Sequence, residues 1–332
     1  MDEVITSAMR TAELARSHWP CIISPPQLFM HRENTVFKVE TTVGPAALRI
    51  HRIGYHDRNA IKSEMLWMAH LARSGLNIPA PILNSDKSYI AEIPLDGQTR
   101  IVDLLTWLTG DPLGKSDAPL AFGAAELRMI FYNLGSEIAK LHIATDAWSI
   151  PANFKRHAWD REGFLGKRPF WGTFWNVTGL TQVHRVILRQ ARAMASSQLD
   201  ALRANGADYG LIHADFVRQN ILVSGTDIRI IDFDDSGWGF RMFDLATALV
   251  KNRDEPDYAE LKQALFAGYR MKRTLTERDE STLDLFLALR DFAHLGWADA
   301  RRTEPGMAAR LPAIRSAALD AAKAYLAAPI QI

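Results

Sequence analysis

The chain has 332 residues, of which 48% are hydrophobic and 23% are charged, and both values are ordinary for globular proteins. Its formal net charge of +1 gives no reason to expect a nucleic acid or a membrane surface as partner. Cys21 is the single cysteine, which excludes an internal disulfide framework and a thiolate metal site. No apolar run has the length of a signal peptide or a membrane span, so we expect a cytoplasmic protein.

The first hundred residues predict a small antiparallel sheet with helices added to it. Alternating apolar residues indicate strands, and apolar residues at helical spacing indicate helices. In chain order the predicted elements are a helix at 3–17, a hairpin at 31–52 with its turn at Gly44 and Pro45, a helix at 59–74, and two strands at 89–93 and 100–105.

After Gly110 the patterns become mainly helical. An irregular, aromatic stretch at 148–177 interrupts them. The predicted helices lie at 124–142, 180–205, 244–251, 258–269, 276–297 and 311–326. The sequence therefore predicts an α+β fold in two parts, residues 1–105 and residues 106–332.

The most informative stretch is LIHADFVRQNILVSGTDIRIIDFDD, residues 211–235. A predicted hairpin separates Asn220 from Asp232, so these two side chains should become neighbours. Amide and carboxylate oxygens are the ligands that magnesium prefers, and Asp215, one loop earlier, could orient a hydroxyl nucleophile. Asp and Asn also cap turns beside strands, which is the structural alternative. For His213, holding the loop by hydrogen bonds is the favoured role.

HADFVRQN followed by IDFDD resembles the catalytic loop and metal-binding segment of the aminoglycoside phosphotransferase and choline kinase-like superfamily. The resemblance implies a protein-kinase-like, two-lobed fold with an antiparallel-sheet N-lobe and a larger helical C-lobe. It also implies ATP and Mg2+ as cofactors, with Asp215 as catalytic base and Asn220 and Asp232 as metal ligands. Residues 238–250 are similar to the helix after the family's metal loop, and Asp244 corresponds to its acidic, structural anchor.

The same resemblance assigns nucleotide contacts in the first lobe. Arg49, in the strand ALRI, stands where protein kinases have a lysine, and Glu64 in the following helix is its expected ion-pair partner. The segment RENTVF resembles the phosphate-covering hairpin but lacks the glycine-rich pattern of protein kinases. The remaining candidate contacts are Asn34 and Thr35 in this hairpin, mainly through backbone amides, and Trp107 and Leu108 at the adenine hinge.

Two features bear on the phosphate acceptor. Aromatic residues crowd the stretch 154–175, where they could form a pocket for an apolar or cationic acceptor or pack into their own core. Asp234 stands where protein kinases have the glycine of their DFG segment, so it could orient a second magnesium ion or an acceptor amine. Asp235 is interpreted as a turn residue.

The sequence therefore predicts an ATP-dependent kinase that phosphorylates a hydroxyl of a small molecule, such as an amino alcohol, an amino acid or an amino sugar. Homoserine kinases and bacterial stress-response Ser/Thr kinases share this loop. A protein Ser/Thr kinase is one alternative, although no activation segment with an APE-like end is present. The other alternative is a nucleotide-binding pseudokinase, and the missing glycine-rich loop and the arginine at position 49 would be consistent with it.

Overall fold

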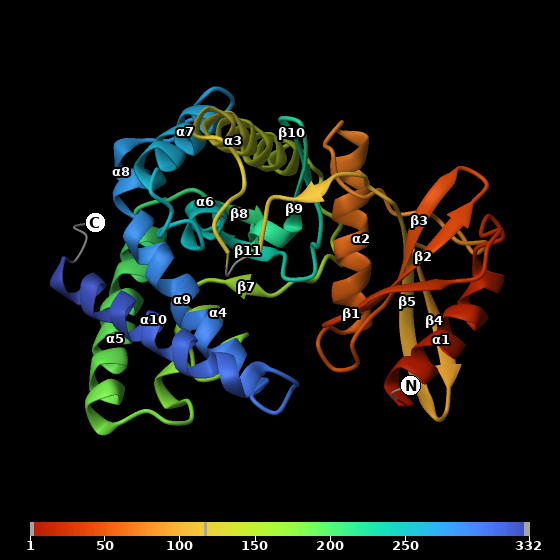
Figure 1. Ribbon diagram of the computed structural model, residues 1–332, viewed down its shortest axis with the longest axis horizontal. Coiled ribbons are helices and arrows are strands. Elements are labelled where there is room, and N and C mark those ends of the chain that lie inside the picture. Colours follow the sequence, from red (N-terminus) through yellow and green to blue (C-terminus); the bar gives the residue numbers. More distant parts are fainter. Residues whose placement is uncertain (1–2, 116–117, 329–332) are drawn as a thin grey trace. The chain divides into compact units, whose positions relative to one another are not determined.

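The computed structural model describes residues 3–115 and 118–328 and divides into two compact units (Figure 1). The first unit consists of Met1–Gly110, Trp148–Arg156 and Arg229–Asp234, and the second of Asp111–Ala147, His157–Ile228 and Asp235–Ile332. Two short segments from the later part of the chain thus belong to the first unit.

A five-stranded antiparallel sheet forms the first unit, with strand order β1-β2-β3-β5-β4. Its strands are β1 (Gln27–His31), β2 (Thr35–Thr41), β3 (Gly44–Ile50), β4 (Ile90–Leu95) and β5 (Gln98–Thr106). Its helices are α1 (Glu3–Ala15), the short 3-10 helix η1 (Arg16–His18) and α2 (Arg58–Arg73). The β4–β5 turn has Asp96 and Gly97 at positive φ, as expected of a tight hairpin.

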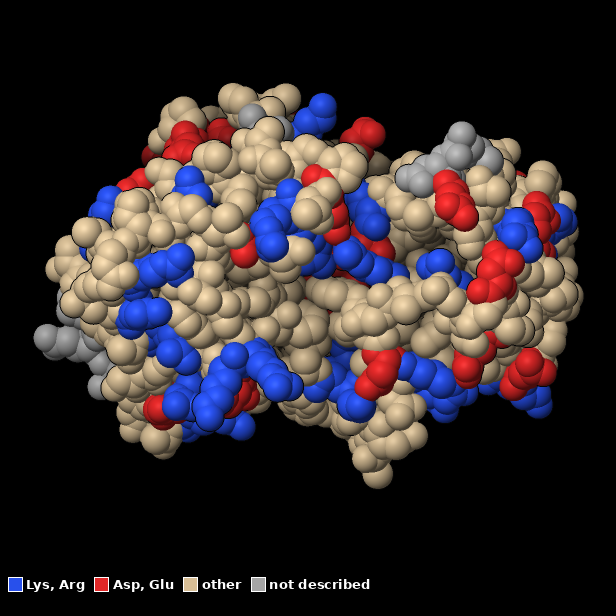
Figure 2. Space-filling view, turned by 90° about the horizontal axis from the view of Figure 1, so that it is seen from below, with Lys and Arg blue, Asp and Glu red and all other residues tan. Residues whose placement is uncertain are grey.

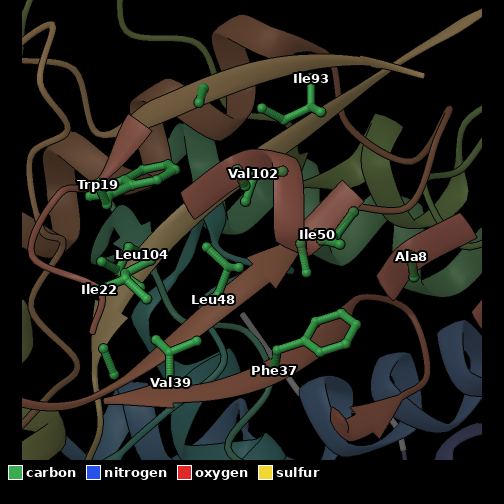
Figure 3. Packing of buried hydrophobic residues seen from close by; sticks show 14 residues of the cluster. Ala8, Trp19, Ile22, Phe37, Val39, Leu48, Ile50, Ile93, Val102 and Leu104 are labelled. Atoms are coloured by element: carbon green, nitrogen blue, oxygen red, sulfur yellow. The ribbon is translucent and has the colours of Figure 1, made fainter. Parts of the chain in front are cut away.

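The two faces of this sheet differ in polarity. Side chains alternate along a strand, so Leu48 and Arg49 of β3 point to opposite faces. Leu48 lies in a buried apolar cluster with Phe37, Val102 and the α1 residue Ala8 (Figure 3). Arg49 instead donates a hydrogen bond to the side chain of Glu64 on α2. One face therefore packs on α1 as a hydrophobic core, and the other holds a buried charge next to α2.

Helix α2 begins and ends where its local sequence requires. The Asp57 side chain accepts a hydrogen bond of 2.9 Å from the Ala60 amide, which caps the helix start. Beyond its last residue, Gly75 adopts φ +84°, a conformation that glycine enters without steric cost. The helix start and the helix end together fix the position of Glu64, in the middle of α2.

The second unit is mainly helical. Its helices are α3 (Ala124–Asp146), α4 (Arg161–Leu165), η2 (Phe174–Asn176), α5 (Gln182–Ala204), η3 (Arg218–Asn220), α6 (Arg241–Val250), α7 (Tyr258–Arg270), α8 (Glu277–Ser281), α9 (Leu283–Ala300) and α10 (Met307–Ala327). Two small three-stranded sheets accompany them, with strand orders β10-β9-β6 and β7-β11-β8. Their strands are β6 (Asp111–Pro112), β7 (Ala158–Trp159), β8 (Tyr209–Ile212), β9 (Ile221–Ser224), β10 (Asp227–Ile230) and β11 (Gly237–Phe240). The division between the units falls within β10.

The mixed α+β class predicted from the sequence is confirmed, and the structure differs in several details. Strands β1, β6, β7, β8 and β11 were not predicted. Gly44 and Pro45 belong to β3, because the turn lies two residues earlier, at Thr42 and Val43. The segment predicted as one helix at 276–297 is divided at Thr282 into α8 and α9.

The distribution of charged residues on the surface is consistent with the low net charge of the sequence. Figure 2 shows basic and acidic side chains interspersed with larger uncharged areas on the face that it presents. Within residues 3–115 and 118–328, no helix is both long enough and apolar enough to cross a membrane.

Candidate active site

The loop between β8 and β9 holds two of the predicted site residues of the second unit, Asp215 and Asn220. Ala214 adopts φ +66°, which turns the chain sharply after β8. Asp215 follows, and the one-turn helix η3 ends at Asn220. The Asn220 Nδ2 donates to Asp215 Oδ2 at 2.8 Å and to the Asp215 carbonyl oxygen at 3.0 Å. The predicted catalytic and amide side chains are therefore in direct contact.

Asp244, in the first turn of α6, holds this loop by hydrogen bonds. Its fully buried carboxylate accepts the His213 amide at 3.0 Å and the Ala214 amide at 2.6 Å. The Asp215 amide donates to His213 Nδ1 at 3.2 Å. Both Asp244 and His213 thus have contacts suited to the supporting roles that the sequence suggested for them.

A buried histidine that the sequence did not single out extends this support. His142 of α3 lies 3.0 Å from Asp244 Oδ2 through Nε2 and 2.8 Å from the Tyr269 hydroxyl through Nδ1. Burial, reinforced by Arg241 and Arg273, lowers the pKa of His142 well below its ordinary value, so the ring is neutral. Burial also raises the pKa of Asp244 to about 7, against the two backbone amides that favour its charged form. His142 lacks a sequence signal because its partners are more than 100 residues away.

Arg290 of α9 is a second contact that sequence reasoning missed. Its Nη2 donates to Asp215 Oδ1 at 2.6 Å, and its side chain is only 7% exposed. The carboxylate of Asp215 therefore has an arginine on one oxygen and the Asn220 amide on the other. Nothing local to the catalytic loop could have indicated a partner 75 positions further along the chain.

In the first unit, Arg49 and Glu64 meet as predicted, with Nη2 and Oε1 2.7 Å apart and both side chains buried. Asp103, which the sequence analysis did not consider, lies directly across from Arg49 on β5 and bonds to the same guanidinium at 2.8 Å. Arg49 and His51, at 2.6 Å, outweigh burial and lower the pKa of Asp103. An acid within the apolar strand IVDLL was the available signal.

Asp234 lies in this same buried cluster of the first unit. Its Oδ1 is 3.9 Å from His51 Nδ1 and 3.8 Å from His56 Nε2. His56 Nε2 is 2.7 Å from the Asp234 carbonyl oxygen, and Arg156 donates to that oxygen while Arg156 Nη1 lies 3.3 Å from Glu64. Asp234 is thus surrounded by bases of its own unit.

The proposed nucleotide contacts at the edges of the sheet have partners of their own. The Asn34 side chain accepts a bond from the Arg52 amide at 3.2 Å, and the Thr35 hydroxyl lies 2.8 Å from His31 Nδ1. These bonds hold the β1–β2 loop in a fixed conformation. The Trp107 amide donates to a carbonyl oxygen of β3 at 3.0 Å. Leu108, which follows β5, has no such backbone bond among the described residues.

The two residues predicted to bind magnesium differ in their surroundings. The Nδ2 of Asn220 is occupied by Asp215, so its side-chain oxygen is the atom left for a cation. Asp232 follows β10 in the first unit, is exposed and has φ +66°, a left-handed conformation that Asp tolerates better than most residues. Both donor groups are neutral or anionic oxygens of the kind that magnesium takes.

The aromatic stretch forms mostly core. Trp159, Phe164 and Phe174 are almost completely buried, and Trp159 and Phe164 contact the α6 residue Phe243. Trp171 is the member next to the site, because its ring lies 4.6 Å from the Arg290 guanidinium carbon. Its Nε1 also donates to Asp235 Oδ1 at 3.3 Å. The stretch therefore contributes one wall residue and otherwise a packed interior.

Residues 29–285, more than half of the chain, match the Phosphotransferase enzyme family. The chain belongs to this family. It is a phosphotransferase of the kinase type, and the resemblance to aminoglycoside phosphotransferases and choline kinases that the sequence predicted is confirmed.

Individual members of the phosphotransferase family extend the comparison. The solved structure of a microcompartment-associated aminopropanol kinase is 28% identical, with a TM-score of 0.82, and covers 97% of this chain and 98% of its own. An amicoumacin kinase in complex with AMP-PNP, Ca2+ and Ami is 21% identical, with a TM-score of 0.75, over 96% and 94% of the two chains. The homoserine kinase of Xanthobacter autotrophicus is 29% identical over 76% of this chain and 72% of its own. The protein-kinase-like fold is thereby confirmed.

Proposed function

We propose that this phosphotransferase transfers the γ-phosphate of ATP to a hydroxyl group of a small molecule, and that the acceptor is an amino alcohol, an amino acid or an amino sugar. The observation that carries the proposal is the contact between Asp215 and Asn220 on a loop held by Asp244. The similarity to an aminopropanol kinase and to a homoserine kinase favours an acceptor of this size and chemistry.

The second part of the chain, residues 106–332, would act as the C-lobe that performs the transfer. Asp215 would accept a hydrogen bond from the acceptor hydroxyl, orient its oxygen toward the phosphorus and take its proton. The bonds from Asn220 and Arg290 fix the carboxylate in one orientation, so little ordering remains when the acceptor binds. Asp244 and His213 would hold the loop, and neither would touch the reacting atoms.

Residues 1–105 would act as the N-lobe that binds the nucleotide. Arg49, oriented by Glu64 and Asp103, would face the phosphates, and the backbone at Asn34 and Thr35 would cover them. Adenine would meet the backbone at Trp107 and Leu108, and the unbonded backbone of Leu108 makes it the better candidate.

Asn220 and Asp232 would hold Mg2+, with Asp234 as a further candidate for a second ion or an acceptor amine. When bound, the ion would neutralise charge that develops on the phosphate oxygens. The donor chemistry of Asn220 fits this role, because its amide nitrogen is already engaged and its oxygen is left to coordinate.

The experiment that tests the proposal is an ATP turnover assay with a panel of hydroxylated amines, amino acids and amino sugars, followed by mass spectrometry of the small molecules. Asp215→Asn should lower kcat by about 10²-fold or more while KM for ATP changes little. Asp227→Asn, an exposed acid at the start of β10, is the matched control and should retain activity. Phosphate recovered on the protein chain instead, or turnover unaffected by Asp215→Asn, would contradict the proposal.

A further inference from the structure

The side chain of Arg290 is only 7% exposed, yet it makes a single ion pair, with Asp215. Its guanidinium stacks on the Trp171 ring, and a single nitrogen, Nη2, donates to Asp215. The Nε and Nη1 atoms are buried and have no hydrogen-bond partner among the described residues. A guanidinium carries five N–H donors in a planar fork, so most of its capacity is unused here.

Unused donors on a buried cation are costly, and native structures rarely keep them without a function. The planar fork of arginine matches two oxygens of one carboxylate or phosphate. Because Nε and Nη1 are covered in this structure, an anion would reach them by a small turn of the guanidinium or of the Trp171 ring. An oxyanion of a bound ligand would supply the acceptors that these nitrogens lack.

The residues around Arg290 add positive charge. Lys251, at the end of α6, has no carboxylate within 4 Å among the described residues, and its pKa is lowered by burial and by Arg290, Arg253 and Arg310 against the pull of Asp291. Asp291 is itself paired with Arg253. Three arginines and one carboxylate thus act on the charge of Lys251.

His294, one turn after Arg290 on α9, is affected by the same positive charges. Burial, together with Lys251, Arg290 and Arg310, lowers its pKa well below the ordinary value. Lys251, Arg290 and Arg310 therefore all oppose a further positive charge on His294.

The two oxygens of Asp215 separate the two sides of the site. Asn220, whose remaining oxygen suits a cation, holds Oδ2, whereas Arg290 holds Oδ1. An anion at Arg290 therefore lies on the other side of the carboxylate from the atom suited to the metal. This position fits a group on the acceptor better than the phosphate that is being transferred.

We propose that Arg290 forms a subsite for a carboxylate of the acceptor, so that the substrate is a hydroxylated carboxylic acid such as a hydroxy amino acid. This inference rests on the proposed function, since it places the acceptor hydroxyl at Asp215. It narrows the acceptor class, because an amino alcohol of the same length lacks the group that the subsite binds. Arg290 is then a specificity-determining residue as well as a partner of Asp215.

The test uses pairs of acceptors that differ only in the carboxylate: L-homoserine and 3-amino-1-propanol, L-threonine and 1-amino-2-propanol, and L-serine and ethanolamine. ATP-dependent phosphorylation by the full chain is measured as kcat/KM for each compound. We expect the acid of at least one pair to exceed its partner by about tenfold or more, as for loss of a charge-assisted hydrogen bond.

Variants then assign that preference to the subsite. Arg290→Met should reduce the acid-to-amine ratio of kcat/KM by about tenfold or more. Arg290→Lys should restore part of the ratio. Arg302→Met, an exposed residue just after α9, is the control and should leave the ratio unchanged.

The ratio separates this subsite from other roles of Arg290. If Arg290→Met lowers both members of a pair by one factor, Arg290 only positions Asp215 or meets the transferred phosphate, and the inference is wrong. Wild-type preference for acceptors without a carboxylate also overturns it while the proposed function stands. Absence of ATP turnover with every hydroxylated compound would instead remove the proposed function itself.

Discussion

A single guanidinium, that of Arg49, holds two buried carboxylates in the first unit. Glu64 and Asp103 approach it at 2.7 and 2.8 Å, and both are fully buried. A lysine ammonium at this position would be a compact point charge, whereas the planar fork can bond two acids at fixed angles. The arginine in the strand ALRI is therefore matched to an additional acid on β5. Its departure from the protein-kinase lysine is compensated within the same sheet.

Asp103→Asn tests this compensation. The change removes one of the two charges that face Arg49 and His51, and loss of one partner from a buried ion pair costs about 3 kcal/mol or more. Urea denaturation should therefore show a free energy of unfolding lower by about that amount. Glu92→Gln on β4 removes an exposed acid paired with Arg58 and should cost less than about 1 kcal/mol. Equal effects of the two substitutions would rule out the buried network as the cause.

Asp244 should make stability depend on pH. Its pKa is about 7 in the folded chain, raised by burial from an ordinary value of 3.8. The folded state then binds a proton more tightly than the unfolded state, so this contribution is fully present below pH 3.8 and is lost as the pH rises through 7. The free energy of unfolding of the wild type minus that of Asp244→Asn should therefore be larger at pH 5 than at pH 8. A difference that grows with pH would show that the folded carboxylate is stabilised as an anion.

At the scale of elements, α3 and α7 pack closely against each other in the second unit. An added Cβ at Gly135 of α3 would lie 1.9 Å from the Leu265 carbonyl oxygen, and one at Gly268 of α7 would lie 1.8 Å from the Tyr132 carbonyl oxygen. Each glycine thus lets the backbone of the other helix approach. Tyr269, which follows Gly268, reaches His142 because the helices are this close.

Gly135→Ala should separate α3 from α7. The new methyl group would overlap main-chain atoms that cannot move independently, so we expect a loss of about 3 kcal/mol or more in the free energy of unfolding. Gly123→Ala, at the N-cap of the same helix, meets nothing within 4 Å and should cost about 1 kcal/mol or less. Thermal or urea denaturation followed by circular dichroism measures both. A Gly135→Ala protein as stable as Gly123→Ala would refute the close contact.

The elements that the sequence predicted well are those with a strong local period. Helices α2 and α3 and the β4–β5 hairpin have regular apolar spacing and clear stop signals. Strand β1 is mostly exposed and lacks the alternation that marks a half-buried strand, and β11 contains two glycines in four residues. The pair Asp215 and Asn220 was within reach because five positions separate its members. Arg290 was not, because tertiary structure alone brings it to Asp215. For Asp103 the only signal was an acid within an apolar strand.

At the scale of the whole molecule, the first unit is discontinuous in sequence. Residues 1–110 contribute the sheet and both long helices, but Trp148–Arg156 and Arg229–Asp234 complete the unit. Trp67 of α2 packs edge-on against Phe233, with ring centroids 5.5 Å apart, and Glu64 takes its second arginine from Arg156. The N-terminal part of the chain therefore depends on segments that are synthesised much later.

A fragment of residues 1–110 should consequently be far less stable than the same residues in the full chain. It would expose the Trp67 ring and leave Glu64 with one cation in place of two, and loss of a buried aromatic partner alone costs about 3 kcal/mol or more. We expect its urea unfolding, followed by tryptophan fluorescence, to lose cooperativity or to shift to a much lower midpoint. Phe233→Ala in the full chain removes only the ring contact and should give an intermediate effect. A fragment that unfolds cooperatively at the midpoint of the full chain would mean that the later segments add nothing to the stability of this unit.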